Sequence, residues 1–149
     1  MKWEVKPIEV VQNYLLQQNS HLSSKYAYLH LTSRQVIDLG CGEGKLELGL
    51  REKGFTHVTS YDLVKIAPHV VECDIKHLPQ KDSSVHAAVF CLSLMGTNYI
   101  EFLLEANRVL SSGGLLLIAE VSSRFSSIPI FKAMLQQLGF QLLKHVEFV

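Results

Sequence analysis

An acid followed by three alternating glycines forms the most distinctive chemical pattern in this sequence. The segment 36–46 reads Val-Ile-Asp-Leu-Gly-Cys-Gly-Glu-Gly-Lys-Leu, which predicts a buried strand, a tight turn and the start of a helix. Glycines in such a turn let a ligand approach the backbone, and the free N–H groups of a helix start favour an anionic group. Asp38, just before the turn, suits a positive charge or hydrogen-bond donors. The pattern therefore favours a ligand with both an ammonium and a carboxylate.

Two phosphate-binding motifs that also use glycine turns do not match this spacing. The dinucleotide fingerprint has glycine at its first, third and sixth positions, and the sixth position counted from Gly40 is Lys45. A P-loop places four residues before its Gly-Lys pair, whereas three residues separate Gly40 from Gly44. The turn fits the methionine moiety of S-adenosylmethionine better than a pyrophosphate, with Gly40 and Gly42 as predicted contacts. A glycine turn without a ligand is the alternative.

The composition indicates one globular domain. The chain has 149 residues, 48% of them hydrophobic, and its 14 basic residues balance 14 acidic ones. This balance argues against strong non-specific nucleic-acid binding, which scales with the phosphates neutralised. Three separated cysteines and scattered histidines predict neither a disulfide framework nor a metal site. We find no signal peptide and no apolar run of about 18 residues in the sequence, so we predict no membrane partner.

Strand-like and helix-like segments alternate along the chain, which predicts an α/β fold. Right-handed crossovers then give a Rossmann-like, doubly wound, mostly parallel sheet with helices on both faces. Residues 1–34 are predicted to form a helical segment that packs on a core of residues 35–149, and a turn is expected at 111–114. Strands are expected at 36–39, 58–61, 70–71, 87–92, 115–119 and 140–146, and helices at 7–18, 25–31, 45–53, 98–110 and 128–138.

Several polar side chains follow the carboxyl ends of the expected strands, where such sheets bind ligands. Asp62 could accept bonds from ribose hydroxyls, with a turn or cap aspartate as the alternative. Asp74 could accept from the exocyclic amine of adenine while Ile75 packs on the ring, or be a solvated turn aspartate. Cys91 is expected to be a buried small hydrophobe near the pocket floor rather than a nucleophile.

The sequence resembles class I S-adenosylmethionine-dependent methyltransferases. The resemblance rests on the glycine motif after Asp38, the acid after the second strand and the Gly-Gly pair before the fifth. A narrower likeness lies in Val-Phe-Cys-Leu-Ser-Leu-Met-Gly-Thr-Asn at 89–98, Glu-Ala-Asn-Arg-Val-Leu at 105–110 and Ala-Glu-Val-Ser-Ser-Arg-Phe at 119–125. These runs resemble the ribosomal RNA-processing protein 8 (nucleomethylin) family.

This resemblance implies N1-methylation of an adenine in large-subunit ribosomal RNA, in the nucleus and nucleolus. It also implies a partner complex that silences ribosomal DNA, as in vertebrate members. Relative to the family, the chain begins at the tail of a segment that completes the cofactor pocket and stops where another strand is usual. Carried over to matching positions, the predicted cofactor contacts are Gly40, Gly42, Asp62, Asp74, Ile75 and Cys91.

We hypothesise that adenine N1 attacks the sulfonium methyl in line, without a strong general base. Alignment of the reactants can then contribute ~7–11 kcal/mol, and a paired adenine must first be flipped out. No catalytic residue stands out; Ser93 and Asn98 could bond the base edge while Met95 packs against it, or Asn98 could only cap a helix. The alternatives are a methyltransferase for a small molecule or protein, and a cofactor-binding interaction or silencing module without turnover. An oxidoreductase is a more distant alternative.

Overall fold

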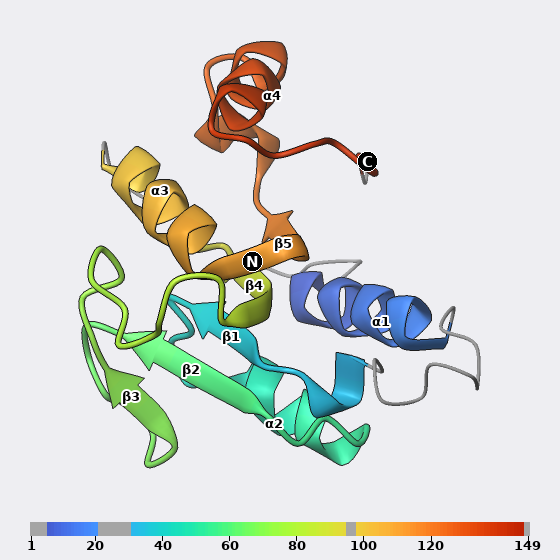
Figure 1. Ribbon diagram of the computed structural model, residues 1–149, viewed down its shortest axis with the longest axis vertical. Coiled ribbons are helices and arrows are strands. Elements are labelled where there is room, and N and C mark those ends of the chain that lie inside the picture. The colour runs from blue at the N-terminus through green and yellow to red at the C-terminus, as the bar shows by residue number, and fades with distance from the viewer. Residues whose placement is uncertain (1–5, 21–30, 95–97, 148–149) are drawn as a thin grey trace.

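The computed structural model describes residues 6–20, 31–94 and 98–147 (Figure 1). Strands and helices alternate along the described chain, as expected. The strands are β1 (Val36–Leu39), β2 (Val58–Asp62), β3 (Val70–Glu72), β4 (Val85–Cys91) and β5 (Leu110–Ala119). The helices are α1 (Pro7–Ser20), α2 (Lys45–Glu52), α3 (Tyr99–Val109) and α4 (Ile128–Gln137), with short 3-10 turns η2 (Leu31–Ser33) and η3 (Ser122–Arg124).

Five strands within the described residues form one parallel sheet in the order β3-β2-β1-β4-β5. The chain moves outward from β1 in one direction and then returns past it to β4, so the order reverses at β1. Ligands in open parallel sheets bind at the carboxyl ends beside such a reversal. The predicted doubly wound sheet is confirmed, and its topology places the glycine turn after β1 at the reversal.

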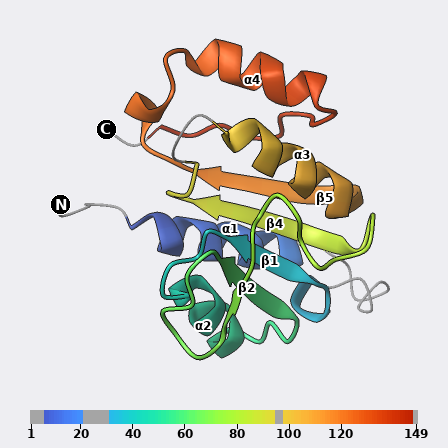
Figure 2. The same cartoon turned by 90° about the vertical axis from the view of Figure 1, so that its left-hand side faces the viewer.

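Helices cover both faces of the sheet, which also agrees with the prediction (Figures 1 and 2). Buried residues of α1 and α2 pack together with β1 and β4 in one cluster, which includes Val11, Leu15 and Leu50. On the other face, α3 supplies Leu103 and Ala106, and α4 packs against the same cluster through partly buried side chains. Buried side chains on both sides of the sheet explain the nearly continuous apolar run of β4.

The predicted turn at 111–114 is wrong, because these residues lie inside β5. The register with β4 passes from Val85 paired with Leu110 to Ala87 paired with Leu115. Residues 111–114 therefore form an irregular bulge opposite His86, and the φ of 77° at Gly113 allows it. Helix α3 ends at Val109 because Leu110 already has extended backbone angles.

The predicted last strand at 140–146 is also wrong. This segment has no strand assignment and pairs with no strand among the described residues. Leu142 and Leu143 are 60% and 69% exposed, so their apolar pattern is not matched by burial. A strand needs a neighbour for its N–H and C=O groups, and the sequence pattern alone does not supply one. The predicted helix at 25–31 falls almost entirely outside the described residues.

Among the described residues, no helix combines the length and apolar character needed to cross a membrane.

Candidate functional site

The glycine turn between β1 and α2 adopts a backbone that glycine favours. Gly40, Gly42 and Gly44 have φ values of 73°, 58° and 71°, in the left-handed region where a Cβ is unfavourable. A Cβ on Gly40 would lie 2.6 Å from the Cβ of Ser93, and a Cβ on Gly44 would overlap the ring of His69. A Cβ on Gly42 would meet nothing within 4 Å. Neighbouring side chains thus support the turn at both ends, while its centre faces open space.

Asp38 is a buried carboxylate with unused hydrogen-bonding capacity at this turn. It is 3% exposed, and its Oδ1 has no hydrogen-bond partner within the described structure. Burial, followed by the nearby charges of Glu47 and Asp62, raises the pKa of Asp38 to about 7. Such a group is costly unless it is paired. A ligand ammonium would complete its bonding and offset the negative charge, so the residues present fit the amino-acid end of S-adenosylmethionine.

Glu47, by contrast, has a protein partner on each carboxylate oxygen. Its Oε1 accepts from the Ser60 hydroxyl at 2.8 Å, and its Oε2 accepts from Arg51 Nε at 2.9 Å. Both Glu47 oxygens thus have a partner, whereas Asp38 Oδ1 has none within the described structure.

Asp62, at the end of β2, links that strand to the glycine turn. Its Oδ2 accepts from the Gly42 N–H at 2.9 Å, and its Oδ1 accepts from the Val64 N–H at 3.3 Å. The side chain does form turn bonds, as the alternative anticipated. Each carboxylate oxygen can still accept a second bond, and Asp62 is only half-buried. It is therefore available to ribose hydroxyls while it holds the turn.

Asp74 and Ile75 follow β3, at the same carboxyl edge of the sheet as the glycine turn and Asp62. Asp74 is exposed and its Oδ1 accepts from the Lys76 N–H at 3.0 Å, which is the turn geometry of the alternative interpretation. Ile75 is 6% exposed and belongs to the core. Its Cδ1 would lie 3.7 Å from a Cβ on Gly40, so this side chain reaches the base of the glycine turn.

Cys91 ends β4 and is partly buried against the apolar cluster under α1 and α2. Burial, followed by the charges of Asp38 and Glu120, raises the pKa of the Cys91 thiol to about 12. The thiol therefore stays protonated at neutral pH and is a poor nucleophile. Its proximity to Asp38 places it beside the glycine turn.

The loop after β4 is anchored on two sides. Leu92 has a φ of 55°, rare for a branched residue. The hydroxyl of Ser93 donates to the carbonyl oxygen of Leu39 at 2.7 Å, next to the glycine turn. The buried Leu94 donates its N–H to Glu120 Oε2 at 3.2 Å. Ser93 thus lies against the turn, whereas Met95 lies outside the described residues.

Asn98 occupies the N-cap position of α3, but its side chain makes no capping hydrogen bond. The alternative that Asn98 serves as a side-chain cap is therefore wrong. Its side chain is exposed at the carboxyl end of the sheet, since α3 starts where the loop after β4 ends.

Comparison with known proteins identifies the family. The sequence model of a family described as "Hypothetical methyltransferase" matches residues 1–148. The chain belongs to this methyltransferase family. Ribosomal RNA-processing protein 8 of Dictyostelium discoideum is 51% identical over 114 residues, which are 76% of this chain and 29% of that protein. The 25S rRNA (adenine(645)-N(1))-methyltransferase of Schizosaccharomyces pombe is 43% identical over 141 residues, 93% of this chain and 43% of that protein. The chain thus spans less than half the length of these relatives.

Solved structures share the methyltransferase fold. An S-adenosylmethionine-dependent methyltransferase from Archaeoglobus fulgidus matches with a TM-score of 0.64 and 15% identity, covering 90% of this chain and 69% of that one. The 4+2 cyclase SpnF matches with a TM-score of 0.72 and 17% identity, covering 95% and 63%. Family and fold together confirm the resemblance to S-adenosylmethionine-dependent methyltransferases. The cyclase illustrates that the fold alone does not set the reaction.

Three features of this candidate site were missed from the sequence. Leu63, directly after Asp62, is 61% exposed and presents apolar surface beside that acid. An apolar residue after a strand-end acid could have indicated it. His69 lies over the turn, with Nε2 at 3.0 Å from the Gly44 carbonyl oxygen. Glu120 joins the loops after β4 and β5. The last two contacts join residues far apart in sequence, so no local pattern could have indicated them.

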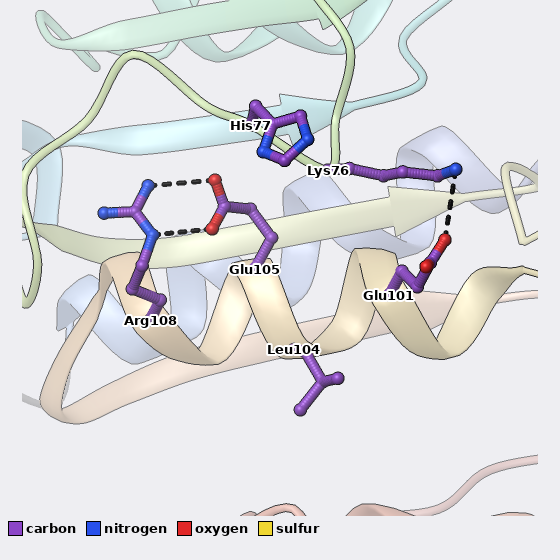
Figure 3. Close-up of a pocket in the computed structure, with 6 residues that line it drawn as sticks. All are labelled: Lys76, His77, Glu101, Leu104, Glu105 and Arg108. Atoms are coloured by element: carbon purple, nitrogen blue, oxygen red, sulfur yellow. Dashed lines mark hydrogen bonds and ion pairs between the residues drawn. The ribbon is translucent and has the colours of Figure 1, made fainter.

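A depression of about 360 Å³ elsewhere contains none of the predicted site residues. It is lined by the loop after β3 and by α3 (Figure 3). An ion pair joins Lys76 of the loop to Glu101 of α3, and a second one joins Arg108 to Glu105 along α3. In the part of the chain that the structure describes, no three metal-binding side chains come together.

We expect Asp62→Asn to weaken binding of S-adenosylhomocysteine by about tenfold without unfolding the turn. The amide oxygen can still accept from the Gly42 N–H, but the charge-assisted bonds to ribose hydroxyls are lost. Isothermal titration calorimetry gives the affinity, and the Gly42 amide resonance in NMR spectra reports the turn. Unchanged affinity together with an unchanged resonance would exclude Asp62 as a ribose contact.

Proposed function

We propose that this chain binds S-adenosylmethionine at the glycine turn and transfers its methyl group to N1 of an adenine in large-subunit ribosomal RNA. The observation that carries the cofactor site is Asp38, a buried carboxylate with an unpartnered oxygen beside a glycine turn whose centre is open. The acceptor is supported by the name of the fission yeast relative, an adenine N1-methyltransferase of 25S rRNA.

In this proposal, the rim of the sheet provides binding and alignment rather than acid–base chemistry. When bound, S-adenosylmethionine supplies a methyl group already activated by its sulfonium. Asp38 holds the ammonium, and Asp62 accepts from the ribose. Asp74, Ile75 and the neighbouring apolar surface of Leu63 receive the adenine. Cys91 contributes a neutral wall, because its raised pKa keeps the thiol protonated.

The loop after β4 holds the acceptor in this proposal. Ser93 is fixed to the Leu39 carbonyl oxygen and so connects the acceptor side to the cofactor turn. Asn98 presents an exposed amide whose donors and acceptor can pair with a base edge. Met95 stays a predicted contact from the sequence. Adenine N1 has its own lone pair, so positioning an unpaired base against the methyl group is the main requirement.

Two measurements test the proposal. Calorimetry with S-adenosylhomocysteine tests the cofactor site, and transfer of a tritiated methyl group to ribosomal RNA fragments tests the acceptor. Transfer to protein or small-molecule acceptors but not to RNA would contradict the RNA substrate. Cofactor binding without transfer to any acceptor would indicate a binding module instead. A nucleolar location and a chromatin-silencing complex, implied by the resemblance, stay predictions that imaging and affinity purification can address.

We expect Asn98→Ala to lower methyl transfer about tenfold at saturating cofactor, because one pair of base-edge bonds is lost. Its melting temperature should stay close to that of the parent chain, since the side chain forms no cap. Ser127→Ala is the matched control: Ser127 Oγ does accept from the Ile130 N–H at 3.3 Å, so this variant should lose ~1 kcal/mol of stability and keep its turnover. Parent-like turnover of Asn98→Ala would remove Asn98 from the substrate role.

A further inference from the structure

Three arginines of the described chain pair with a largely buried glutamate on the same or an adjoining element. The glutamate side chains are between 2% and 9% exposed, so each ion pair has one charge inside the protein and one near its surface. The pairs are Arg51 with Glu47, Arg108 with Glu105 and Arg124 with Glu120.

In two of these pairs the whole guanidinium is used inside the protein. Arg51 binds Glu47 through Nε and donates its terminal nitrogens to the carbonyl oxygens of Thr56 and Val58, at 3.3 and 2.8 Å. Arg108 binds Glu105 in a bidentate manner, as Figure 3 shows, and its terminal nitrogens also donate to the loop before β4. Both arginines therefore tie a loop to a helix, and neither has a terminal nitrogen without a protein partner.

Arg124 is different. It contacts Glu120 through Nε at 3.4 Å, and its two terminal nitrogens make no hydrogen bond within the described residues. Its side chain is 31% exposed, whereas that of Glu120 is 2% exposed. The carboxylate thus fixes one edge of the guanidinium and leaves the opposite, forked edge available to a ligand.

Arg124 lies near the carboxyl edge of the sheet, beside the loop after β4 in which the acceptor contacts are proposed. Arg124 ends η3, a few residues beyond the carboxyl end of β5, which runs beside β4 in Figure 2. Glu120 also accepts the Leu94 N–H from the loop after β4. One buried carboxylate therefore positions both Arg124 and the loop in which the acceptor contacts are proposed.

We propose that Arg124 binds a backbone phosphate of the acceptor RNA next to the target base. A planar guanidinium with two free terminal nitrogens matches the bidentate geometry of a phosphate. The chain has no net charge, so a phosphate must be held by a local cation and not by a general positive field. This inference rests on the proposed RNA substrate and names a residue that contacts its backbone.

The test compares Arg124→Gln with Arg51→Gln by fluorescence anisotropy of a single-stranded oligoribonucleotide, between about 50 and about 200 mM salt. We expect Arg124→Gln to weaken binding about tenfold and to reduce the slope of log affinity against log salt by about 0.7, the share of one phosphate contact. Arg51→Gln removes the same charge but should keep the parent affinity and slope. It should lose more thermal stability, since three protein contacts disappear.

Three results would overturn the inference, and they are distinguishable. If the parent chain binds RNA and Arg124→Gln shows the same affinity and slope, the phosphate contact is absent while RNA methylation stands. If the parent chain binds S-adenosylhomocysteine but no RNA at any salt concentration, both the contact and the RNA substrate are wrong. Equal weakening by both arginine variants would also overturn it, because loss of charge anywhere on the surface would then be sufficient.

Discussion

Asp38→Asn is expected to weaken binding of S-adenosylhomocysteine by about 100-fold, because the ligand ammonium loses its buried counter-charge. The parent chain should bind more tightly as pH rises towards 7 and then level off, since the carboxyl must ionise to hold a cation and its pKa is raised to about 7. The variant should lack this pH dependence. Calorimetry at several pH values measures both effects.

The same substitution is expected to stabilise the ligand-free protein above pH 7. Between the ordinary pKa of 3.8 and the raised value of about 7, the folded state binds more protons than the unfolded state. The free energy of unfolding therefore falls as pH rises through this interval, and the loss is complete above it. Asparagine carries no charge and escapes this penalty, so its advantage in chemical denaturation should grow from pH 5 to pH 8.

Asp82→Asn is the control for the predicted loss of S-adenosylhomocysteine binding in Asp38→Asn. Asp82 is highly exposed and pairs with Arg108, away from the glycine turn, so its amide variant should bind the cofactor product like the parent chain. If Asp38→Asn binds normally, or if affinity in the parent chain does not change below pH 7, Asp38 does not hold the ligand ammonium.

Gly42→Ala is expected to reduce cofactor affinity about 10- to 100-fold, the range given by overpacking a fitted site. The Cβ would project from the middle of the turn into space that no protein atom within 4 Å occupies. A stability loss of ~1 kcal/mol should accompany it, because the φ of 58° is unfavourable for alanine.

Gly54→Ala separates these two effects. Gly54 also has a positive φ, 95°, and a Cβ there would meet nothing within 4 Å, but it lies just beyond α2 at the opposite end from the glycine turn. It should lose similar stability and keep full cofactor affinity in the same titration. If both glycine variants bind as the parent does, the open centre of the turn is not the ligand site.

Local patterns in the sequence were sufficient to predict most of the fold. Strand β1, the glycine turn and the start of α2 each depend on residues that are close together in the sequence. The apolar run before Gly40 and the spacing of the glycines were therefore sufficient to predict them in order. Alternation of strands and helices then restricted the topology, because crossovers between parallel strands are right-handed. The family could also be predicted from the sequence, since its motifs are contiguous runs of residues.

Contacts between distant residues required the tertiary structure. Residues 111–114 form a bulge because β4 lies beside them, and residues 140–146 form no strand because no described strand pairs with them. The raised pKa of Asp38 arises from burial and from carboxylates on β2 and α2. Arg51, Arg108 and Arg124 look alike in the sequence, and only their partners distinguish two structural arginines from one with a free fork. Hydrogen bonding, burial and charge depend on three-dimensional neighbours, which sequence spacing does not specify.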